Sequence, residues 1–347
     1  MSDDGYKNIV VFVSDALRYD YAVDHLPVEN VVPTLAPSLH TPTSFASLFS
    51  ARSPENHIVR DFFDSFEEDV DTAFDFYDNS GFWDGHNSSI NDNILEAETK
   101  ELSDREELFI WMERMIETHL IYGKMGHDRD YDYDKPGQVL YEQDRRGEID
   151  VREKYKEGVE VMWKHFQRHI EDLEELGILE DTLVIITSDH GELLGERYLF
   201  KDRYDHNIPP LKQIVQVPTI FYNHDVDIDS MRLIDLFPTA LSIANEDFEG
   251  FGDGVDVRKD QVETGRNIMR VMPGIAFDTK WSFDGDEWEP TRFSRLSRGV
   301  KTLGTDVGRF FFSRSDELEQ KIEESTEDEE KEEEIKEKLE NLGYMDD

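Results

Sequence analysis

The segment Leu183-Val-Ile-Ile-Thr-Ser-Asp-His-Gly-Glu192 is the most informative stretch of this chain of 347 residues. Its apolar half, residues 183–186, is typical of a strand that is buried on both faces of a parallel sheet. Its polar half places Asp189 and His190 in a glycine turn after that strand, and open α/β sheets bind ligands at the carboxyl ends of their strands. A carboxylate beside an imidazole also forms half of a divalent-metal site. A solvated turn is the alternative interpretation of the same residues.

The spacing of apolar residues predicts further strands and helices around this segment. Apolar runs predict strands at residues 9–13, 108–112 and 217–222. Residues 151–176 carry apolar side chains at intervals of three and four, which predicts an amphipathic helix. Shorter helices are expected from about residue 44 to 49 and over 231–243. Strands that alternate with helices indicate an α/β fold, in which helices sandwich a mostly parallel central sheet.

The character of the chain changes after about residue 246, where glycine becomes frequent. Short aromatic-rich runs at 276–277, 280–283, 292–293 and 309–312 predict a small antiparallel sheet. Residues 316–347 are mostly Glu and Lys, with apolar residues spaced as on one face of a helix. We interpret them as an acidic terminal helix that docks on the protein, with a partner-binding tail as the alternative. We therefore expect a core domain over 1–246 and a C-terminal subdomain over 247–347.

The charge of the chain is strongly acidic. It has 37 basic and 80 acidic residues, a formal net charge of −43 that is spread along the sequence. Such a surface repels itself at low salt, and molar salt screens the repulsion to a Debye length of about 3 Å. We therefore interpret the protein as halophilic. A disordered acidic chain and a nucleic-acid mimic fit less well, because 37% of the residues are hydrophobic and 12% are aromatic.

Several classes of site and location are excluded or disfavoured by composition. The chain has no cysteine, so disulfides, thiolate zinc sites and a cysteine nucleophile are excluded. It has no basic stripe, which disfavours binding to nucleic acid. The N-terminal residues lack the basic region of a signal peptide, and no stretch approaches the ~20 apolar residues that span a bilayer. These features predict a cytoplasmic protein without a transmembrane segment, and they leave its oligomeric state open.

Chemically active side chains occur where such a sheet would collect them. The candidates follow strands or precede a helix: Asp15, Thr41, His119 in Thr118-His-Leu-Ile-Tyr-Gly123, the pair Asp189 and His190, and His206. Each has an alternative interpretation. Asp15 could cap a helix, Thr43 could replace Thr41 as the reactive hydroxyl, His119 could be structural, and Lys201 could replace His206 as an anion-binding group. We expect His40, His57 and His127 to be structural or exposed, and Arg18 and Asp20 to stabilise the first turn.

The order of these segments resembles the sulfatase family of the alkaline phosphatase superfamily. The resemblance comprises the strand that ends at Asp15, the hydroxyl-rich loop and helix, His-x-x-Tyr, Ser188-Asp-His-Gly-Glu-x-x-Gly-Glu196 and Val217-Pro218. Asp235-Leu-Phe-Pro-Thr239 and Leu342-Gly-Tyr344 also resemble family segments, so the resemblance covers nearly the full chain. The Asp-His-Gly-Glu block is its most specific part.

The resemblance implies a metal-dependent covalent mechanism. It assigns a divalent metal to Asp15, Asp189 and His190, with the hydroxyl oxygen of Thr41 as the fourth ligand and nucleophile. A divalent cation lowers the pKa of a bound hydroxyl, which makes the oxygen a better nucleophile toward sulfur or phosphorus. His119 and His206 match the two remaining polar positions. One would protonate the leaving oxygen and the other would hold the oxygens of the transferred group.

Two departures from the family pattern alter this expectation. Typical sulfatases have Cys or Ser at the position of Thr41, which they oxidise to formylglycine, and an Arg at the position of Phe45. An aldehyde-hydrate mechanism is therefore not expected here. His190 replaces the usual Asn, which favours one zinc or manganese ion over calcium. In both respects the chain resembles the threonine-using branch, which includes phosphoethanolamine transferases and lipoteichoic acid synthases.

The function that follows is an ester hydrolase that cleaves sulfate or phosphate esters of small molecules or glycans through Thr41. A transferase that moves a phospho- or sulfo-group to a glycan or lipid headgroup is the alternative within the enzyme class. Two competing hypotheses do not involve catalysis. The protein could be a catalytically inactive module that binds an anion, or an acidic interaction protein. Residues 60–100 and 128–136 are expected to determine the substrate.

Overall fold

The computed structural model describes residues 5–67, 69–84, 90–95, 97, 102, 108–123, 136–198, 201–206, 210–272 and 275–297. A seven-stranded sheet forms its centre, and neighbouring strands follow the order β3 (Asn79–Asp84), β4 (Phe109–Met115), β1 (Asn8–Ser14), β5 (Thr182–Thr187), β8 (Gln216–Phe221), β2 (Val32–Leu35) and β9 (Met231–Arg232). Strand β8 is antiparallel to both of its neighbours, and the other pairs are parallel. The prediction of an α/β fold with a mostly parallel sheet is confirmed.

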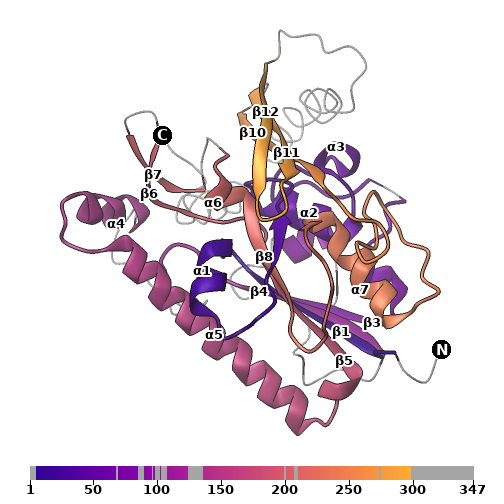
Figure 1. Cartoon of the computed structure of the whole chain (residues 1–347). Helices are drawn as coiled ribbons and strands as arrows, with labels where there is room; N and C mark the ends of the chain where they lie inside the picture. The colour runs from indigo at the N-terminus through magenta and orange to yellow at the C-terminus, as the bar shows by residue number, and fades with distance from the viewer. Residues whose placement is uncertain are drawn as a thin grey trace, which may run out of the picture.

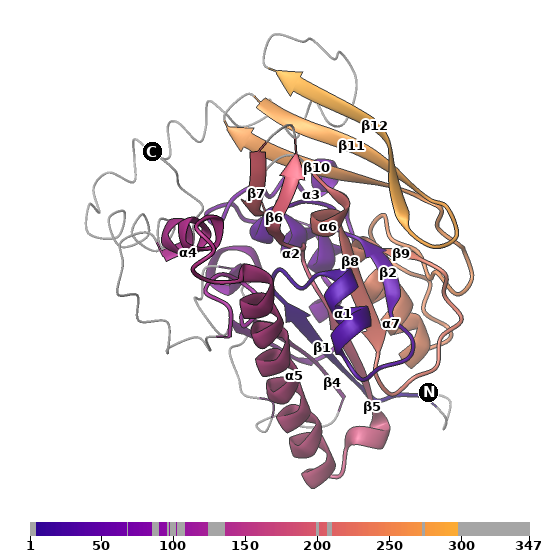
Figure 2. The same ribbon diagram turned by 60° about the vertical axis from the view of Figure 1, so that its left-hand side comes forward.

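The two faces of the sheet are covered by different helices, and strand β1 shows how the sequence divides between them. Ile9, Val11 and Val13 belong to one core cluster, with α2 (Thr41–Ser50) and α7 (Leu236–Ala244). Val10 and Phe12 belong to another, with α1 (Tyr19–His25) and α5 (Val151–Glu175). Successive side chains of a strand point to opposite faces, so an unbroken apolar strand must be buried on both. Figures 1 and 2 show the sheet between α5 and α1 on one side and α7 on the other.

Helix α5 confirms the predicted amphipathic helix almost to the residue. Asp150 caps it by accepting hydrogen bonds from the backbone N–H groups of Arg152 and Glu153, at 3.0 and 3.4 Å. Gly158 allows the helix to approach a loop closely, because a Cβ at this position would lie 2.5 Å from the carbonyl oxygen of Glu117. This contact fixes the loop that carries His119.

Helix α2 begins at Thr41, three residues before the predicted start. The sequence Thr41-Pro42 suggested a loop, but proline is favourable in the first turn of a helix, where its missing N–H would have no partner. The helix predicted over 231–243 is also shorter than expected. Met231 and Arg232 pair with β2 as strand β9, a short 3-10 turn follows over Leu233–Asp235, and α7 begins at Leu236.

The remaining helices and one hairpin are short. Helices α3 (Pro54–His57), α4 (Pro136–Arg145) and α6 (Lys212–Val215) lie in the connections. The hairpin of β6 (Leu193–Tyr198) and β7 (Lys201–Asp205), which the sequence did not predict, pairs Leu193 with Asp205. This pairing brings Asp205 and His206 back beside Glu192. In the described part of the chain, no helix has both the length and the apolar character needed to cross a membrane.

A second, three-stranded antiparallel sheet is formed by β10 (Thr264–Met272), β11 (Ile275–Phe283) and β12 (Trp288–Ser297), as predicted (Figure 2). Trp281 and Trp288 are buried in a cluster with Leu35, so these aromatic residues belong to a core. The backbone N–H of Ile268 donates to the carbonyl oxygen of Pro37 at 2.8 Å, which supports the segment leading to Thr41. Residues 309–312 and the expected terminal helix lie outside the described residues, and the division at residue 246 stays a prediction.

Candidate metal centre and active site

The two acidic segments meet because their strands are neighbours. Strands β1 and β5 are parallel and pair Val13 with Thr187, so both chains leave the sheet at the same edge. Asp15 follows one strand directly, and Asp189 lies two residues beyond the other. The backbone N–H of Ala16 donates to Asp189 Oδ1 at 3.2 Å. This bond joins the two turns and orients the Asp189 carboxylate.

The four residues expected to hold a metal converge at one point. His190 Nε2 lies 3.1 Å from Thr41 Oγ1, 3.3 Å from Asp189 Oδ2 and 3.8 Å from Asp15 Oδ1. All four side chains are fully buried. His190 Nδ1 donates to the carbonyl oxygen of Gly191 at 3.0 Å, which leaves a lone pair on Nε2 in the tautomer that this bond requires. Thr41, rather than Thr43, is therefore the hydroxyl that contacts His190.

A divalent cation fits this arrangement. Asp15 Oδ1 and Asp189 Oδ2 are buried and have no hydrogen-bond partner among the described residues. Together with His190 Nε2 they direct lone pairs toward the same space, and buried acceptors without a partner are costly. Ligand bonds of about 2.0–2.1 Å in tetrahedral geometry would place neighbouring ligand atoms about 3.3 Å apart. Two of the three separations from His190 Nε2 are close to this value.

Arg114 is a residue of the site that sequence reasoning missed. Its Nε and Nη2 donate to Asp15 Oδ2 at 2.9 and 2.5 Å, while Asp15 Oδ1 faces His190. Burial opposes ionisation of Asp15, but the Arg114 guanidinium and the neighbouring histidines hold its pKa well below the usual range. A basic residue near the end of a predicted strand was the only available signal in the sequence.

The pKa of Asp189 is shifted in the opposite direction to that of Asp15. Burial and the like charge of Asp15 raise the pKa of Asp189 to about 8. Two adjacent buried carboxylates cannot both ionise easily unless a cation compensates them. A bound divalent ion would reverse this shift, because its charge becomes the largest in the site. The opposed pKa values of the pair are therefore consistent with a metal centre.

Both predicted catalytic histidines lie beside this centre. The ring of His206 is 4.3 Å from that of His190 and 5.5 Å from that of His119, measured between centroids. His206 Nδ1 lies 2.9 Å from Asp205 Oδ1. Burial would lower the pKa of His206, but Asp205 and then Glu192 raise it to about 9. A cationic imidazole here could stabilise negative charge on a transferred group or supply a proton to a leaving oxygen.

Glu192 is a second residue that sequence reasoning missed, although it belongs to the quoted segment. It is fully buried, and neither carboxylate oxygen has a hydrogen-bond partner among the described residues. Burial, followed by the charge of Asp205, raises its pKa well above the usual range. Ligand atoms of Glu192, Asp205 and His206 lie within 4.8 Å of one another, so a second acidic group adjoins the metal centre.

The residues expected to be structural have structural partners. His40 Nδ1 donates to the carbonyl oxygen of Arg60 at 3.0 Å, and His57 bonds Ser47 Oγ at 2.8 Å. Arg18 pairs with Asp20 at 2.6 Å and also with Glu196, so it stabilises the first turn as predicted. His127, the side chain of Lys201 and the expected specificity segment 128–136 lie outside the described side chains, and residues 60–100 are described only in part.

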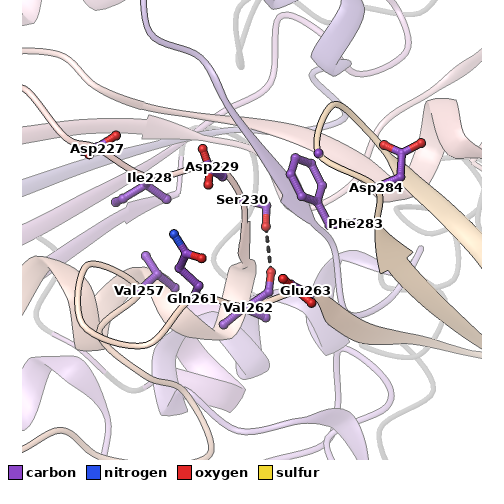
Figure 3. A pocket seen from close by; sticks show the side chains of 11 residues that line it. Asp227, Ile228, Asp229, Ser230, Val257, Gln261, Val262, Glu263, Phe283 and Asp284 are labelled. Carbon is purple, nitrogen blue, oxygen red and sulfur yellow. Dashed lines mark hydrogen bonds between the residues drawn. The ribbon is translucent and has the colours of Figure 1, made fainter.

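A separate pocket of about 280 Å³ opens between the loops before β9 and β10 and the turn between β11 and β12 (Figure 3). None of the metal-centre residues lines it. Its rim carries four carboxylates, those of Asp227, Asp229, Glu263 and Asp284. Negative charge of this density disfavours an anionic ester, so the buried polar centre remains the candidate active site.

Comparisons with known proteins show similarity to one family in sequence and in fold. The family model described as sulfatase matches residues 56–246. A Haloferax volcanii protein, the low-salt glycan biosynthesis sulfotransferase Agl7, is 28% identical over 335 residues, which cover 88% of this chain and 79% of that protein. The fold is similar to that of a 2-O GAG sulfatase (TM-score 0.56, 12% identity, 94% of each chain). It is also similar to that of a phosphonate monoester hydrolase from Silicibacter pomeroyi (TM-score 0.53, 14% identity, 82% of this chain and 88% of that one). Because the family model covers more than half of its length, this chain belongs to the sulfatase family.

Proposed function

We propose that the protein cleaves a sulfate or phosphate ester by covalent catalysis through Thr41. The observation that carries this proposal is the position of Thr41 Oγ1, 3.1 Å from His190 Nε2 and beside the unpaired oxygens of Asp15 and Asp189. A bound divalent ion, held by Asp15, Asp189 and His190, would lower the pKa of the Thr41 hydroxyl. The imidazole and carboxylate donors support zinc or manganese rather than calcium.

The reaction would proceed in two displacements. Thr41 gives its hydroxyl proton to solvent, and Oγ1 forms a bond to sulfur or phosphorus as the ester bond to the leaving oxygen breaks. The leaving alcohol takes a proton from His206, whose ring adjoins that of His190, or from His119, whose ring adjoins that of His206. The oxygen of a second nucleophile then bonds to the transferred group and gives its proton to the same histidine. The bond between Thr41 Oγ1 and the transferred group breaks at the same time, and Oγ1 takes up a proton from solvent.

The second nucleophile distinguishes a hydrolase from a transferase. Water would complete hydrolysis, whereas an alcohol of a glycan or lipid headgroup would complete transfer. Hydrolysis is the simpler reaction for this site, since it needs no acceptor pocket. Transfer of a sulfo-group is the second candidate, because the Haloferax volcanii relative is named as a sulfotransferase of glycan biosynthesis.

The nucleophile can be tested with chromogenic sulfate esters and phosphate mono- and diesters, assayed in molar KCl with zinc or manganese. We expect Thr41→Ala to abolish turnover and Thr41→Ser to retain part of it. Thr43→Ala is the matched control, because Thr43 is buried in the first turn of the same helix. Mass spectrometry of the quenched wild-type reaction should find the sulfo- or phospho-group on the peptide that contains Thr41. Equal rates for Thr41→Ala and the wild type would exclude this nucleophile.

The acceptor can be tested with the same substrates in the presence of glycan and simple alcohol acceptors. A hydrolase should release free sulfate or phosphate in equal amount to the alcohol, whatever the acceptor concentration. A transferase should divert the group to the acceptor and release the leaving alcohol faster as the acceptor concentration rises.

A further inference from the structure

A second cluster of metal-binding side chains lies on the other face of the sheet, between β4 and α5. Side chains of β4 alternate: Arg114 points toward Asp15, and its neighbour Glu113 points toward α5, where it meets two histidines. His165 and His169 are four residues apart on α5, so their side chains leave the same face of the helix. Two histidines at this spacing and a carboxylate from an adjacent strand form a set of three converging donors.

The distances within this cluster match those of a tetrahedral site. His165 Nε2 and His169 Nε2 are 3.2 Å apart. Glu113 Oε2 lies 2.9 Å from His169 Nε2, and Glu113 Oε1 lies 3.5 Å from His165 Nε2. Ligand atoms at about 2.0–2.1 Å from a zinc ion would be about 3.3 Å apart. All three contacts therefore fall near the separation that a shared ion would impose.

The surroundings of the cluster orient its ligands. Glu117 Oε1 lies 2.8 Å from His165 Nδ1, which donates to it and leaves the lone pair of Nε2 directed at the cluster. A carboxylate that accepts from the outer nitrogen of a histidine is a common support of zinc ligands. His169 packs against the rings of Phe12 and Trp111, with centroids 5.1 and 5.8 Å away. Both histidines keep 18% of their side-chain surface exposed, which leaves access for an ion and a water molecule.

A hydrogen-bonded cluster without metal is the competing explanation. In it, His169 Nε2 would carry a proton shared between Glu113 and the lone pair of His165 Nε2. That network has one proton for two acceptors, and it leaves the buried Glu113 Oε2 without a well-formed hydrogen bond although His169 Nε2 is 2.9 Å away. An ion would instead satisfy both imidazole lone pairs and the carboxylate charge together.

We propose that Glu113, His165 and His169 bind a divalent transition metal, zinc by the chemistry of the donors, with water as the fourth ligand. This site is distinct from the centre at Asp15 and does not depend on the proposed reaction. The ion would join α5 to β4 close to the loop that carries His119. Glu117, which orients His165, is followed by Thr118, whose hydroxyl donates to the carbonyl oxygen of Asp15 at 2.6 Å.

Zinc content measured on variants of the full chain separates the two sites. After equilibration with zinc in molar KCl and removal of weakly bound ions, the wild type should hold two zinc ions per chain. Asp189→Asn combined with His190→Gln should remove the ion of the active centre only. His165→Gln combined with His169→Gln should remove the ion of the cluster only. His25→Gln, which replaces an exposed histidine at the end of α1, is the matched control and should change nothing.

The decisive protein is the active-centre variant, because it keeps all three ligands of the proposed site and lacks two ligands of the active centre. It should bind one zinc ion, and X-ray absorption at the zinc edge should show two imidazole ligands. Zinc should also raise its melting temperature, and this rise should be lost when His165 and His169 are replaced as well. If the active-centre variant holds no zinc, or the cluster variant loses none, the proposal is wrong. If the cluster variant fails to fold, Glu113→Gln can be added to the active-centre variant instead. This substitution must then weaken zinc binding at least tenfold.

Discussion

Arg114 donates two hydrogen bonds to one oxygen of the Asp15 carboxylate and leaves the other oxygen facing His190. The two residues lie at the ends of neighbouring strands, β4 and β1, and both are buried. The guanidinium therefore keeps Asp15 ionised where burial would otherwise protonate it. It also fixes which oxygen is available to a cation.

Replacing Arg114 should weaken the metal centre. Arg114→Met leaves Asp15 without its partner, so we expect zinc affinity at the active centre to fall about 10- to 100-fold. Loss of one partner of a buried pair should also lower the free energy of unfolding of the metal-free protein by about 3 kcal/mol. Chelator competition and urea unfolding measure the two effects. Arg114→Lys, which keeps the charge but not the two neighbouring N–H donors, should be intermediate. Unchanged zinc affinity in Arg114→Met would contradict this role.

Gly191 should be required for the position of His190. A Cβ at residue 191 would lie 2.1 Å from the backbone oxygen of Gln213, so Gly191→Ala must displace one of the two segments. We expect a loss of about 1–3 kcal/mol in unfolding free energy, together with weaker zinc binding at the active centre. Gly147→Ala is the control, since its φ of +70° is strained but nothing lies within 4 Å. That variant should lose stability without any change in zinc affinity.

His206 should contribute to turnover. His206→Gln removes an imidazole that adjoins both His190 and His119, and we expect kcat to fall about 100-fold. Asp205→Asn, which removes the partner of His206 Nδ1, should have a smaller effect in the same direction. Steady-state kinetics on a chromogenic ester provide the measurement. His224→Gln, at the ring contact with Tyr6, should keep the wild-type rate. A wild-type rate for His206→Gln would remove this histidine from the mechanism.

His57 should make the protein sensitive to acid. Its Nδ1 accepts from the backbone N–H of Val59 at 3.0 Å, so the buried ring is held neutral and burial lowers its pKa to about 3. The unfolded chain, with an ordinary pKa near 6.5, binds the proton first. Stability contributed by neutral His57 is therefore complete above about pH 6.5 and is lost as the pH falls toward 3, by about 5 kcal/mol in total.

This contribution can be isolated by comparing the pH dependence of unfolding in two variants. As the pH is lowered from 6 to 4, the unfolding free energy should fall in both proteins. The slope for the wild type should be steeper than that for His57→Gln by up to about 1.4 kcal/mol per pH unit. His25→Gln, at an exposed histidine, should follow the wild type. Parallel curves for the wild type and His57→Gln would show that this ring does not titrate on unfolding.

Stability should rise steeply with KCl concentration. The net charge of −43 repels itself over a Debye length of about 10 Å at 0.1 M salt but only about 3 Å at 1 M. Urea unfolding at increasing KCl measures the effect. Replacing the exposed residues Glu171, Glu174 and Glu175 of α5 with Gln should reduce the dependence on salt. Equal stability in dilute buffer and in molar KCl would contradict a halophilic adaptation.

Local patterns predicted much of the architecture. The buried strands β1, β4, β5 and β8 and the long helix α5 follow from runs and spacings of apolar residues, which act over a few positions of the chain. The predicted secondary structure was wrong where contacts with distant segments override the local preference of the residues. Residues 32–35 form a strand only because β8 and β9 flank them, and Thr41 begins a helix although Pro42 suggested a loop. The reversal of β8 relative to β5 is set by a connection that stays at one edge of the sheet.

The sequence by itself determined where reactive side chains lie along the chain. Asp15 and Asp189 follow strands, Thr41 lies before a predicted helix, and His190 follows Asp189 directly. Only the tertiary structure decided which of them meet. The contact of Arg114 with Asp15, the burial of Glu192 beside His206, and the meeting of Glu113 with His165 and His169 all depend on strand order and on which face each helix covers. Those choices arise from packing between distant segments, whose free energy is shared by the whole core and is carried by no single stretch of residues.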